Sequence, residues 1–363
     1  MAGIGFTLDF ERPNVEDDDM HSLHRFLLAC CVSILCSACE NGTPIAPPIE
    51  EPIPHFDYPL DDTLRMHHVQ TKGTHNSYHV INPELSDPND RGVTHSALDV
   101  QLGVEGVRQL EIDIRRDMDT GDFKVGHVPL LDEGTTCPTL SECLQIIKDW
   151  SDAHRAHHAI TVMLDIKDAV VAPEEVETYF GELHGIIGKV WPAQRIVTPD
   201  EVQGDFATLG EAVKTDGWPV LGQLRGRIIF LMYSIAFGKA YSREGTSLSG
   251  RMIFTRAELS DPTLAWALYD NSEVNAGAVA NAVAANLLVR TRADVDLAQP
   301  DPMLRDTALA SGSHFVVTDF PMQIDGVDYW VDIPGGAPSR CNPVTAPPEC
   351  TSEAIEDPAF VGP

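Results

Sequence analysis

Side chains suited to catalysis or metal binding gather after a strand-like run near residue 70. The segment 72–80 reads KGTHNSYHV and places a glycine, a hydroxyl, an imidazole, an amide and a second hydroxyl at five consecutive positions. A local explanation exists, because Gly73 can form a turn and Thr74, Asn76 or Ser77 can cap the element that follows. The same groups can also contact a phosphate or a metal ion, so the segment alone leaves both interpretations open.

A second concentration of charge lies in EGVRQLEIDIRRD, at 105–117. Side chains alternate between the two faces of a strand, and one face carries the polar set Gln109, Glu111, Asp113 and Arg115. Two carboxylates on one inward face repel each other unless a positive charge lies between them. A solvated edge strand would tolerate them, but the apolar opposite face favours burial. The pattern predicts a hard cation with oxygen ligands, and calcium accepts carboxylate and amide oxygens together.

Two further strand-like segments end in polar residues. FKVGHV, at 123–128, brings His127 to a turn, where an isolated histidine is usually only solvated. ITVMLDIKD, at 160–168, places Met163, Asp165 and Lys167 on one face of a strand. The acid and the amine form either a buried ion pair or two groups that face a ligand.

The elements that must position these residues alternate along the chain. Strands are predicted at 66–71, 108–114, 123–128, 159–166, 227–233, 252–255, 286–291 and 314–320, with helices between them, including 139–157 and 173–187. About eight strands separated by helices predict an α/β fold, a TIM-type (β/α)8 barrel that need not be regular. The catalytic groups of such barrels come from the carboxyl-terminal ends of several strands.

The composition is that of a globular protein, with 363 residues of which 43% are hydrophobic. The 55 acidic and 25 basic residues give a formal charge of −30. Such a charge opposes the binding of nucleic acid, or of an anionic membrane, through a general electrostatic field. A cationic ligand or a metal ion fits the balance better.

The N-terminal region has the pattern of an export signal. Residues 1–39 are interpreted as an over-extended start and a lipoprotein-type signal peptide that begins at Met20. The apolar run at 26–35 is too short to span a bilayer as a helix, although a buried N-terminal helix is an alternative. Cys39 ends a lipobox-like LCSAC, and a proline-rich linker follows at 40–63. We expect an exported protein, either a bacterial surface lipoprotein anchored through Cys39 or a secreted one.

The cysteine spacing agrees with export. Four of the eight cysteines fall in the predicted signal. The others predict two short-range disulfides, Cys137 with Cys143 and Cys341 with Cys350, as is typical of an oxidising compartment. A four-cysteine metal site is the alternative, although neither pair has zinc-knuckle spacing. The proline-rich extension at 325–363 is then expected to wrap the barrel, pinned by the second disulfide.

Several motifs in order carry a resemblance to a known family. GTHNSY, LEIDI, VGH and MLDIK, followed by VRTRAD and SGSHFVVTDFP, resemble the X-region of the calcium-dependent phosphatidylinositol-specific phospholipases C, most closely the bacterial secreted branch. The resemblance covers residues 66–321, within a barrel domain at 64–324. It implies a phosphoric diester hydrolase that acts on phosphatidylinositol-type phospholipid at a membrane surface. We expect a monomer.

The resemblance also implies roles for individual residues. The catalytic histidine pair would be His75 and His127. The calcium ligands would be Asn76, Glu111, Asp113 and Asp165. Asp165 stands where the eukaryotic enzymes have glutamate, which shortens its reach by one methylene. The phosphate contacts would be Lys167 and Arg115.

The implied reaction begins with the inositol 2-hydroxyl, whose pKa calcium would lower. One carboxylate, Glu111 or Asp165, would take the hydroxyl proton. His127 would protonate the leaving diacylglycerol oxygen, and His75 would stabilise the pentacoordinate phosphorus.

Two other functions compete with this interpretation. A glycerophosphodiester phosphodiesterase shares the barrel, the histidine pair and the acidic metal site, but that family has arginine rather than asparagine after its first histidine. A non-catalytic surface lipoprotein that binds a lipid or a partner is the other alternative. The histidines of AHRAHH, at 153–158, need no role in either case, because cations are favoured where they are predicted to close a helix.

Overall fold

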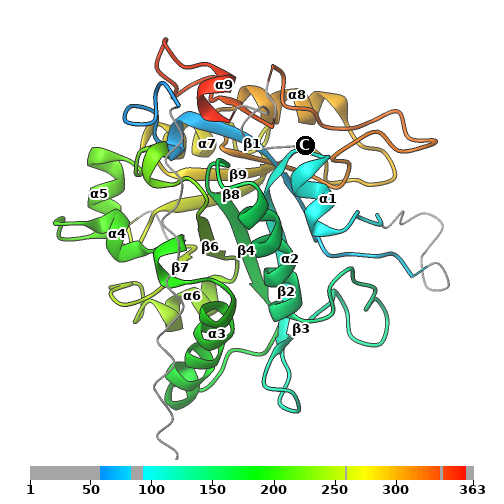
Figure 1. Ribbon diagram of the computed structural model, residues 1–363, viewed down its shortest axis with the longest axis vertical. Coiled ribbons are helices and arrows are strands. Elements are labelled where there is room, and N and C mark those ends of the chain that lie inside the picture. Colours follow the sequence, from blue (N-terminus) through cyan, green and yellow to red (C-terminus); the bar gives the residue numbers. More distant parts are fainter. Residues whose placement is uncertain (1–57, 83–92, 258–259, 336–337, 357–363) are drawn as a thin grey trace, which may run out of the picture. The chain divides into compact units, whose positions relative to one another are not determined.

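Among the described residues, eight parallel strands form the sheet that carries the candidate site (Figure 1). In chain order they are β1 (Val69–Thr74), β2 (Val107–Arg116), β4 (Ile160–Ile166), β6 (Ile228–Met232), β7 (Ile253–Thr255), β8 (Trp266–Asn271), β9 (Leu288–Arg292) and β10 (Phe315–Thr318). Successive members of this set pair in parallel, and β10 pairs with β1, so the sheet curls as a barrel does. No ladder joins β7 to β8 within the described part of the chain. The predicted TIM-type architecture is therefore confirmed, with one open seam.

This computed structural model describes residues 58–82, 93–257, 260–335 and 338–356. The predicted signal peptide, Cys39 and most of the predicted linker lie outside them. None of the helices in these ranges is both long enough and apolar enough to span a bilayer.

Helices lie between the strands and pack on the outside of the sheet (Figure 1). They are α1 (Leu98–Gly103), α2 (Leu140–Ala153), α3 (Val176–Val190), α4 (Pro199–Gln203), α5 (Leu209–Asp216), α6 (Ile235–Tyr241), α7 (Ala276–Ala284) and α8 (Pro302–Ala310). The longer ones are amphipathic; α2, for example, buries Leu140, Leu144 and Ile147 at helical spacing. Thr139 caps α2 by accepting a hydrogen bond from the backbone N–H of Glu142.

Two predicted strands need correction, and two strands were not predicted. Residues 66–68 form a 3-10 turn, so the first strand starts at Val69. The segment 123–128 contains only the short β3 (Phe123–Val125), which pairs antiparallel with β2 and is not a strand of the parallel set. The sequence pattern does not reveal β8, because WALYDN is a short apolar run that periodicity cannot distinguish from a helical turn. A two-residue strand, β5 (Ile196–Val197), pairs with β6 and also escapes prediction.

The predicted position at a helix end holds for one histidine of the histidine-rich segment and not for the other two. His154 is the C-cap of α2, and its Nδ1 lies 2.7 Å from the carbonyl oxygen of Trp150. His157 and His158 lie beyond the end of the helix and are fully buried. Burial, the largest effect, lowers the pKa of His157 to about 3 and that of His158 to about 4. Both are neutral at pH 7, so neither supplies the cation expected at a helix end.

The C-terminal extension packs against the amino-terminal ends of the parallel strands. Its strand β11 (Ser339–Cys341) pairs antiparallel with the start of β1. Beyond it, α9 (Ser352–Ile355) leads to the buried Glu356, whose carboxylate accepts hydrogen bonds from Arg108 Nε at 3.1 Å and from Nη2. His158 Nε2 lies 2.8 Å from Ser339 Oγ. The tail therefore closes this end of the barrel, as the sequence predicted.

Arg225 forms hydrogen bonds with residues near both ends of the described chain. Its Nη2 donates to Asp61 Oδ1 at 2.6 Å, and its guanidinium also donates to the carbonyl oxygens of Ala354 and Ile355. We refer to this buried set, with the Arg108–Glu356 pair and His158, as the floor of the barrel.

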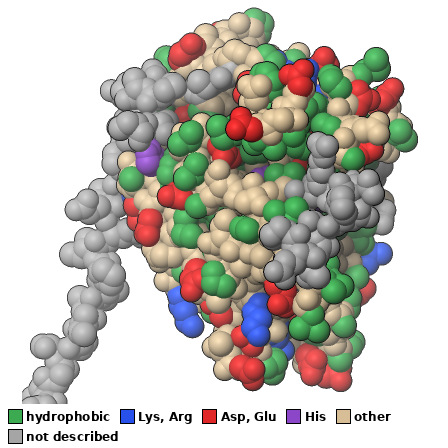
Figure 2. Space-filling view, turned by 90° about the vertical axis from the view of Figure 1, so that its right-hand side faces the viewer, with side chains coloured by type: hydrophobic (Ala, Val, Ile, Leu, Met, Phe, Trp, Pro, Cys, Tyr) green, Lys and Arg blue, Asp and Glu red, His purple; other side chains and the backbone are tan. Residues whose placement is uncertain are grey.

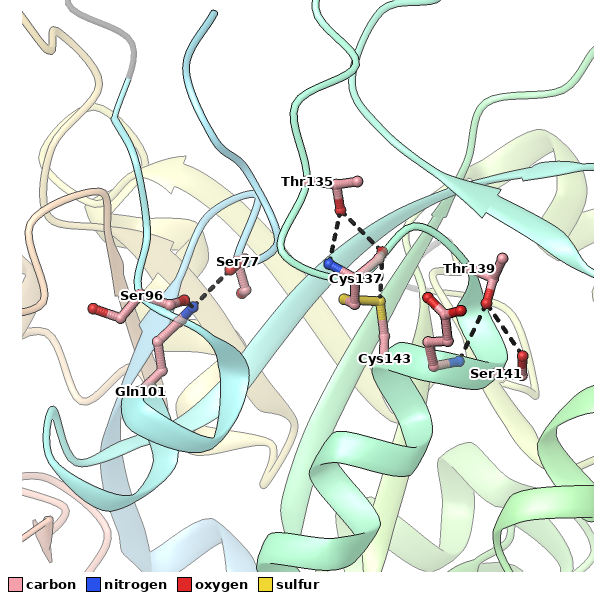
Figure 3. Close-up of a disulfide and its surroundings, with 9 residues drawn as sticks. Ser77, Ser96, Gln101, Thr135, Cys137, Thr139, Ser141 and Cys143 are labelled. Carbon is pink, nitrogen blue, oxygen red and sulfur yellow. Dashed lines mark hydrogen bonds between the residues drawn. A yellow bond between two sulfur atoms is a disulfide. The ribbon is translucent and has the colours of Figure 1, made fainter.

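Both predicted disulfides are present. Cys137 bonds to Cys143, and Cys341 bonds to Cys350. Figure 3 shows the first of them, which ties the loop after β3 to the first turn of α2. Thr135 Oγ1 donates to the carbonyl oxygen of Cys137 at 2.9 Å and braces the same loop.

Candidate active site

The segment HNSY follows β1 directly and is locked to β2. Ser77 N–H donates to the carbonyl oxygen of Glu111 at 2.9 Å, and Glu111 N–H donates to Ser77 Oγ at 2.8 Å. Asn76 has a φ of 46°, in the left-handed region that asparagine tolerates better than most residues. This turn holds His75 and Asn76 beside the carboxylate-bearing strand.

Three carboxylates meet at the carboxyl-terminal ends of β2 and β4. The parallel register places Asp113 opposite Asp165, and Glu111 lies two residues earlier on the same face of β2. One oxygen from each of Glu111, Asp113 and Asp165 lies within 4.8 Å of the others. All three residues are buried, and Asp113 is 0% exposed. We refer to this end of the barrel, where these acids and His75 lie, as the mouth.

Two cations already contact the three acids. Lys167 Nζ lies 2.5 Å from Asp165 Oδ2 and 3.0 Å from Asp113 Oδ2. Arg290 Nη2 donates to Glu111 Oε2 at 2.6 Å. The buried Asp165–Lys167 pair, which the sequence left as an alternative, is therefore present inside the acidic cluster.

Lys167 and Arg290 nevertheless neutralise the negative charge of the three acids only in part. Burial is the main cause that raises the pKa of Asp113, to about 7; Glu111 and Asp165 add to the effect and Lys167 opposes it. Burial likewise raises the pKa of Asp165. Asp113 Oδ1 has no hydrogen-bond donor among the described residues. An orphaned, buried carboxylate oxygen beside two other acids fits a hard divalent cation such as calcium.

His75 has a carboxylate partner that the sequence motifs did not assign. Its Nδ1 lies 3.0 Å from Asp319 Oδ1, directly after β10. Burial opposes the cationic form, but the carboxylates of Glu111 and Asp319 raise the pKa of His75 above its usual value. Arg292 donates to Asp319 Oδ2, and His95 Nε2 lies 2.9 Å from the carbonyl oxygen of His75. These carboxylates favour the cationic form of the His75 imidazole at the mouth.

His127 lies in the loop after β3, with 40% of its side chain exposed. Its Nδ1 lies 2.9 Å from Asp132 Oδ2. Arg115 donates to the carbonyl oxygens of Gly126 and His127, both at 2.7 Å. This places Arg115, a predicted phosphate contact, on the backbone of the loop that carries His127.

Tyr78 relates the His127 loop to the acids. Its side chain is fully buried, and burial followed by the nearby carboxylates of Asp113, Glu111 and Asp132 raises the pKa of its hydroxyl far above the usual range. The Tyr78 hydroxyl therefore lies close to Glu111 and Asp113 on β2 and also to Asp132 in the His127 loop.

The surface around the barrel is acidic. On the face drawn in Figure 2, Asp and Glu side chains are spread among apolar ones, and Lys and Arg are few. This agrees with the excess of acidic residues in the sequence.

The fold and this site can be compared with known proteins. The family model described as phosphoinositide phospholipase C, Ca2+-dependent, matches residues 64–124 and 115–343. The chain therefore belongs to the family of calcium-dependent phosphoinositide phospholipases C. Its members are phosphoric diester hydrolases whose cofactor is calcium. No curated protein matches the sequence.

Solved structures share the fold at low sequence identity. The apo calcium-dependent phosphoinositol-specific phospholipase C from Pseudomonas sp. is 17% identical, with a TM-score of 0.55, over 76% of this chain and 98% of that chain. Its myoinositol complex is 18% identical, with a TM-score of 0.54, over 76% and 97%. The calcium-dependent phosphatidylinositol-specific enzyme from Streptomyces antibioticus is 16% identical, with a TM-score of 0.54, over 71% and 96%.

The structure brings together most of the predicted site and adds partners to it. Glu111, Asp113, Asp165 and Lys167 form one cluster, whereas His127 lies in a loop with its own carboxylate. The residues that the motifs did not assign are Asp132, Arg290, Arg292 and Asp319. Two signals were available for them: Asp319 directly follows a strand, and Asp132 lies five residues after a candidate histidine.

Proposed function

We propose that the protein is a calcium-dependent phospholipase C that cleaves the phosphodiester of phosphatidylinositol-type lipids. The observation that carries the proposal is the cluster of Glu111, Asp113 and Asp165, buried at the strand ends of a member of this family. The family membership favours this activity over that of a glycerophosphodiester phosphodiesterase.

The proposed calcium ligands are Asn76, Glu111, Asp113 and Asp165. They offer three carboxylates and one amide oxygen, a donor set that calcium prefers over softer ligands. When bound, the ion would make the inositol 2-hydroxyl more acidic and offset the negative charge on phosphorus.

Glu111 is the proposed base for the 2-hydroxyl. Arg290 holds its Oε2 atom, and Ser77 holds its backbone on both sides. These contacts fix the carboxylate in one direction, which general-base catalysis requires. Lys167 and Arg115 remain the proposed phosphate contacts, although each already has partners. Lys167 contacts Asp113 and Asp165, and Arg115 donates to the carbonyl oxygens of Gly126 and His127.

The two histidines have different proposed roles. His75, whose cationic form Glu111 and Asp319 favour, would stabilise the charge that develops on the phosphoryl oxygens. His127, whose ring is partly exposed, would give its Nε2 proton to the diacylglycerol oxygen as the bond between that oxygen and phosphorus breaks.

A phospholipid surface is the proposed partner. Large apolar side chains are exposed in loops that follow the carboxyl-terminal ends of several strands; they include Leu130, Leu131, Val170, Val295, Met322 and Ile324. Because these strand ends share the mouth, the loops can insert apolar groups between lipid head groups beside the acids. The acidic surface makes a general electrostatic attraction to anionic lipid a weak contributor.

Vesicles that contain phosphatidylinositol test the proposal. We expect cleavage to stop in excess chelator and to return with calcium more effectively than with magnesium, whose octahedral demand suits this ligand set less well. Asp113→Asn should shift activation to higher calcium concentration and weaken calcium binding in calorimetry. Asp149→Asn, an exposed carboxylate on α2, is the control and should change neither.

Three results would count against the proposal. Full activity in excess chelator would mean that the acids serve only the ion pairs with Lys167 and Arg290. Preferred turnover of glycerophosphocholine would indicate the other diesterase activity. Calcium binding without turnover of either substrate would indicate a non-catalytic surface protein.

A further inference from the structure

The Asp132 carboxylate contacts two histidines beside the mouth. Asp132 Oδ2 lies 2.9 Å from His127 Nδ1, and Asp132 Oδ1 lies 2.8 Å from His79 Nε2. His79 comes from the segment after β1, whereas Asp132 and His127 belong to the loop after β3. The carboxylate therefore bridges two segments that flank the mouth.

His79 is held at both ring nitrogens. Its Nδ1 lies 2.7 Å from the carbonyl oxygen of Val93, and its Nε2 lies 2.8 Å from Asp132 Oδ1. Although burial opposes it, hydrogen bonds from His79 and His127 hold the pKa of Asp132 below its usual value. The His79 ring therefore links the Asp132 carboxylate to the backbone at Val93.

The backbone of the His127 loop is anchored separately. Val80 N–H donates to the Gly134 carbonyl oxygen at 3.0 Å, and Thr136 N–H donates to that of Tyr78 at 2.8 Å. A Cβ at Gly134 would lie 1.9 Å from the Val80 carbonyl oxygen, so this close approach requires glycine. These contacts place the loop, but they do not set the angle of the His127 ring.

Asp132 sets that angle. Because it accepts the Nδ1 proton of His127, the other nitrogen, Nε2, is left as the one that can exchange a proton with a ligand. His79 in turn holds the Asp132 carboxylate in place through its Nε2. The other groups near this pair are the Tyr78 hydroxyl and Arg115.

We propose that Asp132 and His79 are positioning residues for His127: Asp132 fixes the ring and its tautomer, and His79 holds the Asp132 carboxylate in position. This inference rests on the proposed role of His127 as the group that protonates the leaving oxygen. It adds two residues that act through His127 and touch neither the ion nor the lipid.

Three variants test the positioning. Asp132→Asn should lower kcat by about 10- to 100-fold, with KM for phosphatidylinositol and calcium affinity within about threefold of wild type. His79→Ala should lower kcat by about tenfold. His79→Gln keeps an N–H donor for Asp132, so it should restore kcat to within about threefold of wild type.

The matched control is His184→Gln. His184 is also partly buried and paired through Nε2, in its case with the Tyr241 hydroxyl at 2.7 Å, on α3 and away from the mouth. It should leave kcat and the pH profile unchanged. An equal loss in this control, an unchanged kcat in Asp132→Asn, or no recovery in His79→Gln would overturn the proposal.

Imidazole nitrogen NMR of the wild-type protein tests the same inference without turnover. We expect neutral His127 to carry its proton on Nδ1, a preference that is lost in Asp132→Asn. The same tautomer in Asp132→Asn as in the wild type would overturn the inference. If these spectra hold but His127→Ala remains fully active, the proposed function fails and the geometric inference does not.

Discussion

Buried charges are paired at one end of the barrel and are only partly compensated at the other. At the floor, Glu356 faces the guanidinium of Arg108, and Arg225 faces Asp61 together with backbone carbonyl oxygens. At the mouth, Glu111, Asp113 and Asp165 crowd together, and Asp113 Oδ1 lacks a donor among the described residues. Paired charge at the floor completes the fold, whereas uncompensated charge at the mouth is suited to an external cation.

The largest expected difference between the two ends concerns histidines. His127→Ala at the mouth should lower turnover by roughly two to four orders of magnitude, as expected for a lost general acid, with nearly intact calcium affinity. His158→Ala at the floor should instead lower the free energy of unfolding by about 1–3 kcal/mol, since it breaks the contact with Ser339. Steady-state kinetics and denaturant unfolding measure the two effects. Similar kinetic losses in both variants would erase the distinction.

The next effect concerns the floor ion pair. Glu356→Gln removes the charge opposite the buried Arg108 while keeping the side-chain shape. We expect it to lower the free energy of unfolding by about 3–5 kcal/mol, because a buried guanidinium is left without its counter-charge. Denaturant unfolding provides the measurement, with Glu353→Gln on the exposed side of α9 as the control. A loss below about 1 kcal/mol would mean that the pair contributes little to closure.

The same kind of change at the mouth should have the opposite sign. Asp113→Asn removes a buried carboxylate whose pKa is raised to about 7, so its ionised form destabilises the folded state above that pH. In chelator at pH 8, we expect the free energy of unfolding of the variant to be about 1–3 kcal/mol higher than that of the wild type. With saturating calcium the advantage should disappear. Thermal unfolding under both conditions tests this, and destabilisation in chelator would contradict it.

The last difference is a gradual loss of stability in mild acid. Four buried histidines near the floor, His67, His157, His158 and His314, have pKa values lowered to about 3 or 4, chiefly by burial. Their folded-state pKa values lie below the unfolded value of 6.5, so their contribution is complete above that pH. It should be lost as the pH falls toward 4, because the unfolded chain binds protons first. Unfolding free energies measured between pH 7 and pH 4 in chelator should show this decline; a flat profile would contradict it.

The acidic face was predictable because strand alternation is a local rule. It correctly placed Glu111 and Asp113 on one face of β2, and barrel geometry brought Asp165 beside them. The cationic partners of these acids were harder to predict from the sequence, because Arg290 reaches Glu111 across the sheet and no local pattern encodes that contact. Asp319 was overlooked for the same reason: its meaning depends on β10 lying beside β1.

The strand predictions failed where local signals were shortest. β8 lacks strict alternation, and β3 resembles a barrel strand until its turn with β2 is known. The disulfides were predictable because each pair lies close in sequence. The predicted roles of the site residues remain predictions that the proposed assays address.

The hydrogen bonds of Arg225 have a consequence for how the chain folds as it is synthesised. Its partners are Asp61, at the start of the described chain, and Ala354 and Ile355, near its end. A ribosome or an export channel delivers the chain from its N-terminus, so Arg225 emerges long before the carbonyl groups that satisfy it. Until then its guanidinium and that of Arg108 have no counterpart from the tail, and the floor cannot close. The floor of the nascent barrel can therefore form only after α9 has been synthesised. We expect chaperones to bind the incomplete chain during synthesis or export.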